Sequence, residues 1–450
     1  MMIQTRIFRW VTLVFMLMVS FHLQAQETLD LKKCIEIALE QNIAVRKAGL
    51  NTEKSGLNLQ KSKASLLPNL NAYASQGYSF GNSLDYTTYE YVREKINSNY
   101  FQLNSEVTLF QGFSKINTVK ANQYALEANI HSNQNMKDQI ALQTAAAYLA
   151  ILMNLENVAF MEEQIKLTKS MLEKTKILVE VGQETKAKEL ELNAELANNE
   201  YNLVEVQNKL EQSYLDLKQL LNWDMKKPLS ISKYAVDMMS LGNYENIDIE
   251  SIINQYVSEL PQMKQAKAEL ESAQYAYKAA KGLMYPSLSL QGNLTTRYSS
   301  LKNPLTGQIT PFSEQLDNNF GQYFTFGLSI PLFNNLNTYG NTQAARLNIR
   351  NAELNYRESE VKAKNNIYEA WFNLKNAINK YESAVKSQEA QKLLFEQSSV
   401  MYQEGVISYY EWQSARNGLT RAENTLLGAK YECVYRMKVF DYYRGIDISL

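Results

Sequence analysis

The sequence repeats one long interval, and this internal duplication constrains the fold more than any local propensity does. An alternating run ends at Phe110, and Gly182 follows it at an offset of 72 (182 − 110 = 72). A second run ends at Phe333, and Gly405 lies at the same distance after it, so both pairs share an offset of 223 (333 − 110 = 405 − 182 = 223). An unbroken helix over this interval is ~100 Å long at ~1.5 Å per residue. Two copies of one long helical hairpin are therefore expected.

Seven-residue spacing indicates that these intervals are coiled-coil helices. One apolar row precedes Gly182 and another follows it: Val158, Ile165, Leu172 and Val179, then Leu196, Leu203, Leu210 and Leu217. No proline lies between Phe113 and Asn222 or after Phe333, so the strongest helix breaker is absent there. The return from Gly182 to Asn222 covers only ~60 Å and the helix before Pro68 another ~39 Å. One long helix is thus expected to be about as long as two short helices stacked end to end.

Before each helical interval the period changes to two, which is typical of strands. In the first half the alternating apolar residues include Phe101, Leu103, Val107 and Leu109. The second half repeats the pattern with Phe324, Phe326, Leu328 and Ile330. We expect one hairpin of two strands in each half, at about 69–112 and about 287–333, with strands of roughly 12 to 15 residues, longer than the ~9 to 11 that cross an outer membrane.

Four strands cannot close a barrel by themselves. Open strand edges are excluded from lipid because their backbone groups would be unpaired. A membrane barrel must therefore be shared between chains, and since the smallest closed barrels have eight strands, a dimer is the minimum and a trimer gives twelve. An exposed soluble sheet is the alternative.

The N-terminus has the features of a secretory signal. Arg6 and Arg9 precede an apolar core at 11–19, and Leu23-Gln24-Ala25 provides a cleavage point. An uncleaved membrane anchor is the alternative. After Ala25 we find no apolar run that approaches the ~20 residues of a spanning helix.

The expected organisation follows from the signal and the duplication: a signal peptide at 1–25, a first repeat at 26–224, a mid-height equatorial connection at 225–245 and a second repeat at 246–450. Each repeat is expected to hold a helix, a strand hairpin and a long helical hairpin. The offset between the repeats is 218 at Pro68 and Pro286 and 223 at Phe110 and Phe333. The second repeat therefore carries five extra residues between Pro286 and Phe333 (223 − 218 = 5), which belong in a loop.

Charge and reactive residues exclude several functional classes. The 46 basic and 47 acidic side chains balance, so no nucleic-acid partner is indicated. Cys34 and Cys433 do not occupy equivalent positions, and we interpret both as small buried or semi-buried hydrophobes, with a disulfide as the alternative. His131 is the only histidine after the signal. No phosphate loop, metal-ligand cluster or paired nucleophile appears, so no enzyme activity, cofactor or metal is expected.

The ordered set of motifs resembles the TolC family of outer-membrane efflux channels over essentially the whole mature length. The motifs are Leu67-Pro68 and Tyr285-Pro286 at the start of the strand hairpins, Leu109-Phe110 and Leu332-Phe333 at their ends, and the glycines Gly182 and Gly405. The resemblance implies a mainly α protein with a β-barrel part. Duplicated helical hairpins would form an α-barrel in the periplasm, and four transmembrane strands per chain would complete a twelve-stranded barrel in the outer membrane as a homotrimer.

The resemblance also implies a function and partners. The chain would be the exit duct of a tripartite efflux or type I secretion system, contacting outer-membrane lipid, a periplasmic adaptor (membrane fusion) protein and an inner-membrane pump of the resistance-nodulation-division (RND) or ATP-driven (ABC) type. Drugs, metal ions and exported peptides or proteins remain open as substrates. The alternative is a periplasmic coiled-coil spacer or envelope-tethering protein with a soluble sheet.

In the family the hairpin tips bind the adaptor, which here points to Val181, Gly182, Gln183, Gly405 and Val406. The family motif is Val-Gly-Leu, so Gln183 departs from it. A glycine permits positive φ and close approach of a partner helix; a glycine that only ends a helix is the alternative.

The resemblance places a pore constriction at the second tip. Two family carboxylates stand six and nine residues after the glycine, where this chain has Glu411 and Ser414. A ring of three Glu411 side chains would favour cations, and the neutral Ser414 would weaken that gate. An ordinary exposed helical carboxylate is the alternative for Glu411.

Overall fold

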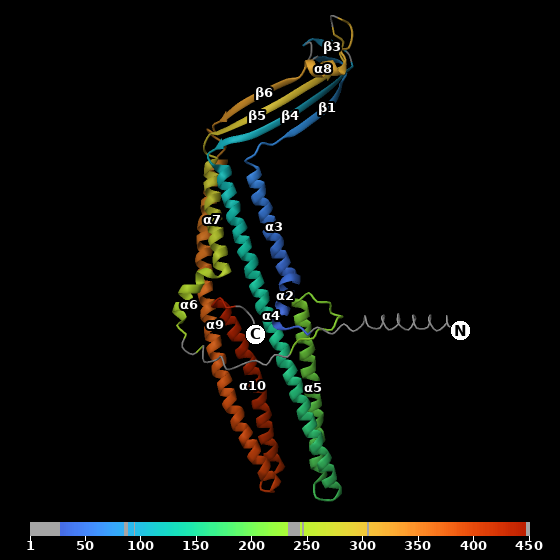
Figure 1. Ribbon diagram of the computed structural model, residues 1–450, viewed down its shortest axis with the longest axis vertical. Coiled ribbons are helices and arrows are strands. Elements are labelled where there is room, and N and C mark those ends of the chain that lie inside the picture. Colours follow the sequence, from blue (N-terminus) through green and yellow to red (C-terminus); the bar gives the residue numbers. More distant parts are fainter. Residues whose placement is uncertain are drawn as a thin grey trace, which may run out of the picture. The chain divides into compact units, whose positions relative to one another are not determined.

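The computed structural model describes residues 28–84, 89–93, 95–232, 244, 247–303 and 306–446. The expected signal peptide at 1–25 lies outside these residues, and so does most of 233–245 in the expected connection. The chain forms two compact units (Figure 1). We name the helical unit, which contains the chain up to Gly49, Asn133–Pro261 and the chain from Val361, and the sheet unit, which contains Leu50–Ser132 and Gln262–Glu360. Each unit draws on both sequence repeats.

The long helices repeat at single-residue accuracy. Helix α4 is Ser114–Glu180 and its counterpart α9 is Asn337–Gln403, with 67 residues in each. The return helices are α5, Lys186–Leu220, and α10, Tyr409–Tyr443, with 35 residues in each. Both ends of α9 and α10 keep the offset of the sequence repeat from their counterparts (337 − 114 = 443 − 220 = 223). The predicted duplication of long helical hairpins is confirmed.

Unusual backbone angles recur at the same offset. Residues with positive φ form four pairs with this offset: Gly112 and Asn335, Phe113 and Leu336, Gly182 and Gly405, and Asn222 and Gly445. The first two pairs turn the chain from strand into long helix, and the last two follow helix ends. Three of the four pairs consist of glycine or asparagine, which adopt this conformation at the least cost, so in these pairs the duplication is visible in the choice of residue as well as in the spacing.

The shorter helices complete both units. They are α2 (Leu31–Gln41), α3 (Ile43–Ala64), α6 (Ile249–Tyr256), a 3₁₀ turn (Val257–Glu259) and α7 (Pro261–Gly282). Helices α3 and α7 are equivalent, because both of their ends have the same offset (261 − 43 = 282 − 64 = 218). Pro261 stands at the first position of α7, where a missing N–H costs nothing.

The core of the helical unit joins five helices. Its fully buried side chains come from α2, α4, α5, α9 and α10 and include Cys34, Tyr148, Leu217, Leu374 and Phe440. Cys34 and Cys433 are both buried free thiols, as their interpretation as small hydrophobes predicted. Among the described residues one helix, α4, is apolar enough over part of its length to cross a membrane on composition alone. That test is also met by core helices, and α4 supplies Ile140, Ala145, Leu149 and Ile151 to this core.

The start of α3 and the end of α5 are joined by the hydrogen bonds of one side chain. The Asn42 side chain donates to the Leu220 carbonyl at the end of α5 (2.9 Å) and accepts from the Ala44 N–H at the start of α3 (2.8 Å). One buried amide therefore caps two helix ends. This joint supplies the expected meeting point of the two short helices.

The sheet unit contains a four-stranded antiparallel sheet in the order β1-β4-β5-β6. Its strands are β1 (Asn71–Ser79), β4 (Ile96–Gln111), β5 (Ser287–Ser299) and β6 (Gly321–Ser329). The two predicted hairpins are thus joined through β4 and β5. The outer strands have nine residues each, which is shorter than expected. A short pair, β2 (Asn82–Leu84) and β3 (Tyr91–Arg93), and helix α8 (Phe312–Asn318) lie in the connections.

Two glycines allow the sheet to meet its helices. A Cβ added to Gly282, at the end of α7, would lie 2.6 Å from the Gly112 carbonyl oxygen. A Cβ on Gly112 would lie 2.3 Å from the Gly282 carbonyl oxygen. The two backbones are in contact where α4 begins, so any side chain at either position would separate them.

Candidate functional site at the hairpin tips

Each helical hairpin turns at a glycine in a Schellman motif. Gly182 donates its N–H to the Val179 carbonyl (3.0 Å), and Gln183 donates to the Leu178 carbonyl (2.8 Å). The turn at Gly405 repeats both bonds. The φ angles of the glycines are +75° and +76°, which residues other than glycine, asparagine and aspartate would adopt at a cost of roughly 1–2 kcal/mol. Ending the helix is therefore one established role of both glycines.

The tips leave space around these glycines. Apart from the glycine and its two neighbours in the chain, no described atom lies within 4 Å of a Cβ built on Gly182 or Gly405. Val181, which precedes Gly182, and Val406, which follows Gly405, are both exposed. The predicted adaptor-binding residues thus lie together at each turn and remain accessible.

Glu411 has a local role that the family resemblance did not indicate. Ser408 is the N-cap of α10, and its N–H and hydroxyl both donate to Glu411 Oε2 (2.8 Å each). The Ser408 hydroxyl accepts from the Glu411 N–H in return, which completes a capping box. The backbone N–H of Ser408, followed by its hydroxyl, lowers the pKa of this exposed carboxyl. The spacing Ser408-x-x-Glu411 is the sequence signal for this motif; the pore-facing role of Glu411 stays a prediction.

The equivalent position in the first hairpin is Lys188, which joins the two hairpins of the helical unit. Its ammonium lies 4.8 Å from the Tyr402 ring centroid and 4.6 Å from that of Tyr409. It also donates to the Tyr402 hydroxyl and to Glu184 (2.9 Å). Burial by itself lowers the pKa of Lys188, but the bonds to Tyr402 and Glu184 outweigh it, so the net pKa is raised. The cation of α5 is held by aromatic residues of α9 and α10.

Those aromatic residues form a compact stack around Trp412. The Tyr402 ring lies 5.6 Å from the Trp412 ring and the Tyr409 ring 5.7 Å, with interplanar angles of 30° and 29°. The indole N–H of Trp412 donates to the Ser399 hydroxyl (3.1 Å). The buried tryptophan therefore packs against two tyrosine rings, and its donor is satisfied.

Next to this stack, a buried arginine connects three helices. Arg416 of α10 is 4% exposed and donates to Glu195 of α5 (2.9 Å). The second terminal nitrogen of the Arg416 guanidinium donates to two residues of α4, Thr168 (3.0 Å) and Gln164 (3.2 Å). Gln413 donates to the second oxygen of Glu195 (2.7 Å). These hydrogen bonds give the buried guanidinium and the Glu195 carboxylate most of the partners that a buried charge requires.

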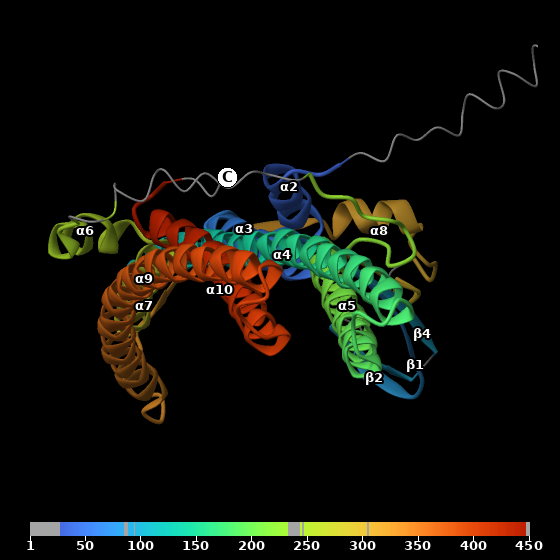
Figure 2. The same ribbon diagram turned by 90° about the horizontal axis from the view of Figure 1, so that it is seen from below.

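Lys188, Trp412 and Arg416 were not predicted from the sequence. A signal existed for Arg416, because it follows Trp412 by four positions and so falls on the buried face of α10. Figure 2 shows α9 and α10 side by side, and α4 beside α5. The network joins these two helix pairs near their tips.

Comparison with known proteins identifies the family. The family model described as outer membrane efflux protein matches residues 34–222 and 252–435. These segments cover most of both repeats. The chain belongs to the outer membrane efflux protein family. This is a family of efflux channels and not of enzymes, and the protein is located in the outer membrane with its helical part in the periplasm.

Solved channels share this fold at low sequence identity. The CmeC outer membrane channel of Campylobacter jejuni has a TM-score of 0.78 and 19% identity, over 93% of this chain and 87% of that one. The MtrE outer membrane channel of Neisseria gonorrhoeae has a TM-score of 0.75 and 17% identity, over 93% and 89%. VceC of Vibrio cholerae gives 0.75 and 15%, over 93% and 96%. A search of curated protein sequences gives no match.

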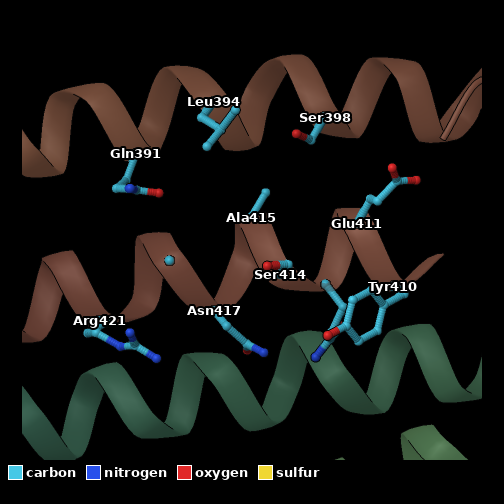
Figure 3. A pocket seen from close by; sticks show the side chains of 11 residues that line it. Gln391, Leu394, Ser398, Tyr410, Glu411, Ser414, Ala415, Asn417 and Arg421 are labelled. Carbon is cyan, nitrogen blue, oxygen red and sulfur yellow. The ribbon is translucent and has the colours of Figure 1, made fainter. Parts of the chain in front are cut away.

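In this outer membrane efflux protein, Glu411 and Ser414 lie in one groove between α9 and α10 (Figure 3). The groove has a volume of about 640 Å³. Gln391, Leu394 and Ser398 point into it from α9, as Figure 3 shows. On the α10 side the face that carries Glu411 also carries Arg421, ten residues on (421 − 411 = 10), or ~15 Å along the helix. No sequence motif singled out this arginine, whose charge opposes that of Glu411.

We predict that Arg416→Leu destabilises the packing of the tips. The partly buried Glu195 would lose its cation, which typically costs about 3–5 kcal/mol. Hydrogen–deuterium exchange should become faster in peptides from the first turns of α5 and α10. The double variant Arg416→Leu/Glu195→Leu should recover most of the protection, since it removes both charges. Arg421→Leu, an exposed arginine of the same helix, is the control. Unchanged exchange in the single variant would show that the network does not hold the tips.

Proposed function

We propose that this chain is the outer-membrane exit duct of a tripartite efflux or type I secretion system, and that it acts as a homotrimer. The observation that carries the proposal is the sheet. Outer strands β1 and β6 each have one edge without a partner among the described residues. On one face Phe324, Phe326 and Leu328 are 75%, 69% and 66% exposed. Water disfavours such a face and lipid favours it, but lipid does not tolerate the open edges.

Pairing β1 of one chain with β6 of the next satisfies both requirements. Three chains then contribute twelve strands, within the range of closed outer-membrane barrels. Eight strands from two chains would also close; the family resemblance favours three. The spacer alternative would leave both the apolar face and the edges in water, so it is disfavoured.

Helices α3 and α9 each carry an apolar seam, which is a row of exposed apolar side chains along one side of the helix. Apolar side chains recur every seven residues on α3 and on α9 and are exposed in the single chain: Ile43, Leu50 and Leu57, then Leu347, Leu354, Val361 and Tyr368. Seven-residue spacing is the pattern of a helix that packs against another helix. Packing between neighbouring copies would bury both seams, which supports an α-barrel built from several chains.

The hairpin tips are the proposed docking site for the periplasmic adaptor, which would couple the duct to an inner-membrane pump. Support comes from the open space around Gly182 and Gly405 and from the exposed Val181, Gln183 and Val406. The duct itself would be passive, with transport energy supplied by the pump. Drugs, metal ions and exported polypeptides all fit such a conduit.

The mature protein in detergent should have the mass of three chains by light scattering or native mass spectrometry, because only shared strands close the barrel. Reconstituted in a planar bilayer, it should carry a steady ionic current. A Phe326→Arg variant, which puts a charge on the apolar face, should reduce insertion into the outer membrane. A monomer in mild detergent, or a bilayer that stays silent, would contradict the proposal.

Substituting Gly182→Asn separates the two roles of the tip glycine. Asparagine tolerates positive φ, and the chain already uses Asn222 at the corresponding place after α5. The variant should therefore fold and assemble normally, yet its larger side chain should reduce adaptor docking several-fold. A photo-crosslinking side chain at Gln183 measures docking in intact cells as the yield of adaptor adduct. An unchanged yield would mean that Gly182 only ends the helix.

Glu411→Gln and Arg421→Gln should shift ion selectivity in opposite directions. Glutamine preserves the capping box, so the first change removes a charge without removing the cap. If α10 lines the aperture, cation preference should fall in Glu411→Gln and rise in Arg421→Gln. The measurement is the reversal potential across a salt gradient, with Glu173→Gln on α4 as the matched control. Equal potentials in all four proteins would place neither side chain at the aperture.

A further inference from the structure

The second strand hairpin carries a helix that breaks the duplication. Helix α8, Phe312–Asn318, lies between β5 and β6, in the stretch where the second repeat has its five extra residues. The first repeat has the short pair β2 and β3 in the corresponding connection. No helix occurs among the described residues of that first connection, 80–84, 89–93 and 95, so the duplication does not explain α8.

Helix α8 covers a strand edge that β6 leaves open. The β5–β6 ladder ends at the pair Thr295 and Gly321, while β5 continues to Ser299. Gln315, which is 6% exposed, accepts from the Ser299 N–H and donates to the Ser299 carbonyl (2.9 Å each). Asn319, just after the helix, donates to the Arg297 carbonyl (2.9 Å). Side-chain amides thus replace the missing strand, as an edge in or near lipid requires.

The helix lies on the apolar face of the sheet. Alternate residues of β5 share one face, so Thr296 and Tyr298 belong with Leu290 and Leu294. The Thr296 hydroxyl donates to the Leu316 carbonyl of α8 (2.7 Å), and the Tyr298 ring lies 5.1 Å from the Phe312 ring. The register Leu290–Phe326 puts the exposed aromatic residues of β6 on this same face.

The outward surface of α8 is polar, unlike the sheet face beside it. Ser313, Glu314, Asp317 and Asn318 are all exposed, and Phe312, at 47%, is the one large apolar side chain that it exposes. Carboxylates are costly on a hydrocarbon-facing surface. Along this face the chain therefore changes from exposed phenylalanine and leucine on β6 to a helix with two acidic groups.

The position of α8 along the strands gives the side of the membrane. Strand β5 begins after α7 and β6 ends before α9, so the helix is at the sheet end that is not joined to these helices (Figure 1). Since the helical part is periplasmic, this end faces the outer leaflet.

We propose that α8 is an interfacial helix that binds the headgroup layer of the outer leaflet and fixes the upper limit of the apolar band. The inference rests on the proposed function, since it requires the apolar face to contact lipid. Phe312 reaches the part of the acyl chains next to the headgroups, and Glu314 and Asp317 stay among hydrated headgroups. Aromatic side chains at this height are typical of outer-membrane barrels. The lipid-exposed band thus ends at a structural element of the chain itself.

Nitroxide labels at three positions test this assignment in the full chain reconstituted in phospholipid bilayers. The variants are Phe326→Cys, Phe312→Cys and Asp317→Cys, and the unmodified chain is the labelling blank because Cys34 and Cys433 are buried. Collision with oxygen, which concentrates in lipid, is compared with collision with a water-soluble nickel chelate. We expect position 326 to be shielded from nickel, 317 to be several-fold more accessible to nickel, and 312 to be intermediate.

Two results would overturn the assignment while leaving the proposed function intact. Position 317 shielded as strongly as 326 would put α8 inside the hydrocarbon. Position 312 as exposed to nickel as 317, without oxygen enrichment, would put α8 above the membrane or against another protein. If the label at position 326 is accessible to the nickel chelate, the sheet does not face lipid, and both the proposed function and the interfacial role of α8 are contradicted.

A second pair of variants tests how the helix is held. Gln315→Ala removes the amide that pairs with Ser299, so the nickel accessibility of the label at 312 should rise several-fold. Asn318→Ala, an exposed residue of the same helix, should leave it unchanged. Equal accessibility in both backgrounds would show that the amide does not hold α8 at the interface.

Discussion

The structure depends on one requirement, that every backbone group of a strand in lipid must have a partner. A four-stranded sheet with one apolar face cannot meet it alone, because β1 and β6 end the sheet. The rest of the chain is consistent with a protein that is completed by its own copies. Helices α3 and α9 present exposed apolar seams at seven-residue spacing. Where β6 stops short of the end of β5, the Gln315 amide supplies the missing partners within the chain.

Duplication followed by local divergence explains how the two hairpins fit together. The repeats keep the same helix lengths and the same positive-φ positions, so the backbone of one hairpin is a copy of the other. They differ in side chains at equivalent places. The third position of the return helix is Lys188 in one hairpin, and Glu411 in the other. The lysine binds Tyr402 and Tyr409 of the opposite hairpin, whereas the glutamate caps its own helix. Divergence has made the copies complementary.

The elements that the sequence predicted well are those defined by long, regular patterns. Heptads and the absence of proline predicted α4, and the repeated interval without proline predicted α9. The alternation of apolar residues predicted the strands and their apolar face. The strand ends were not predictable, because β6 stops where α8 takes over its hydrogen bonds, which is a tertiary event. Helix α8 has only seven residues, too few for a period, and Gln315 bonds to backbone groups that any sequence would offer. Arg416 was missed for a different reason: its partners Glu195 and Gln164 are distant in the chain, at sequence separations of 221 and 252.

The helix cap formed by Glu411 is compatible with the pore-facing role proposed for the same side chain. The cap uses Oε2 for both bonds from Ser408 and leaves Oε1 outside them, so the carboxylate can face the groove while it holds the helix end. Because the cap lowers the pKa of the folded state, its contribution to stability is present above the pKa of the unfolded chain. It is lost as the pH falls through the folded value. The same bonds keep the group ionised in mildly acidic surroundings, so a charge at the aperture would persist there. A helix cap at this position therefore stabilises the ionised side chain and does not compete with the charge proposed at the aperture.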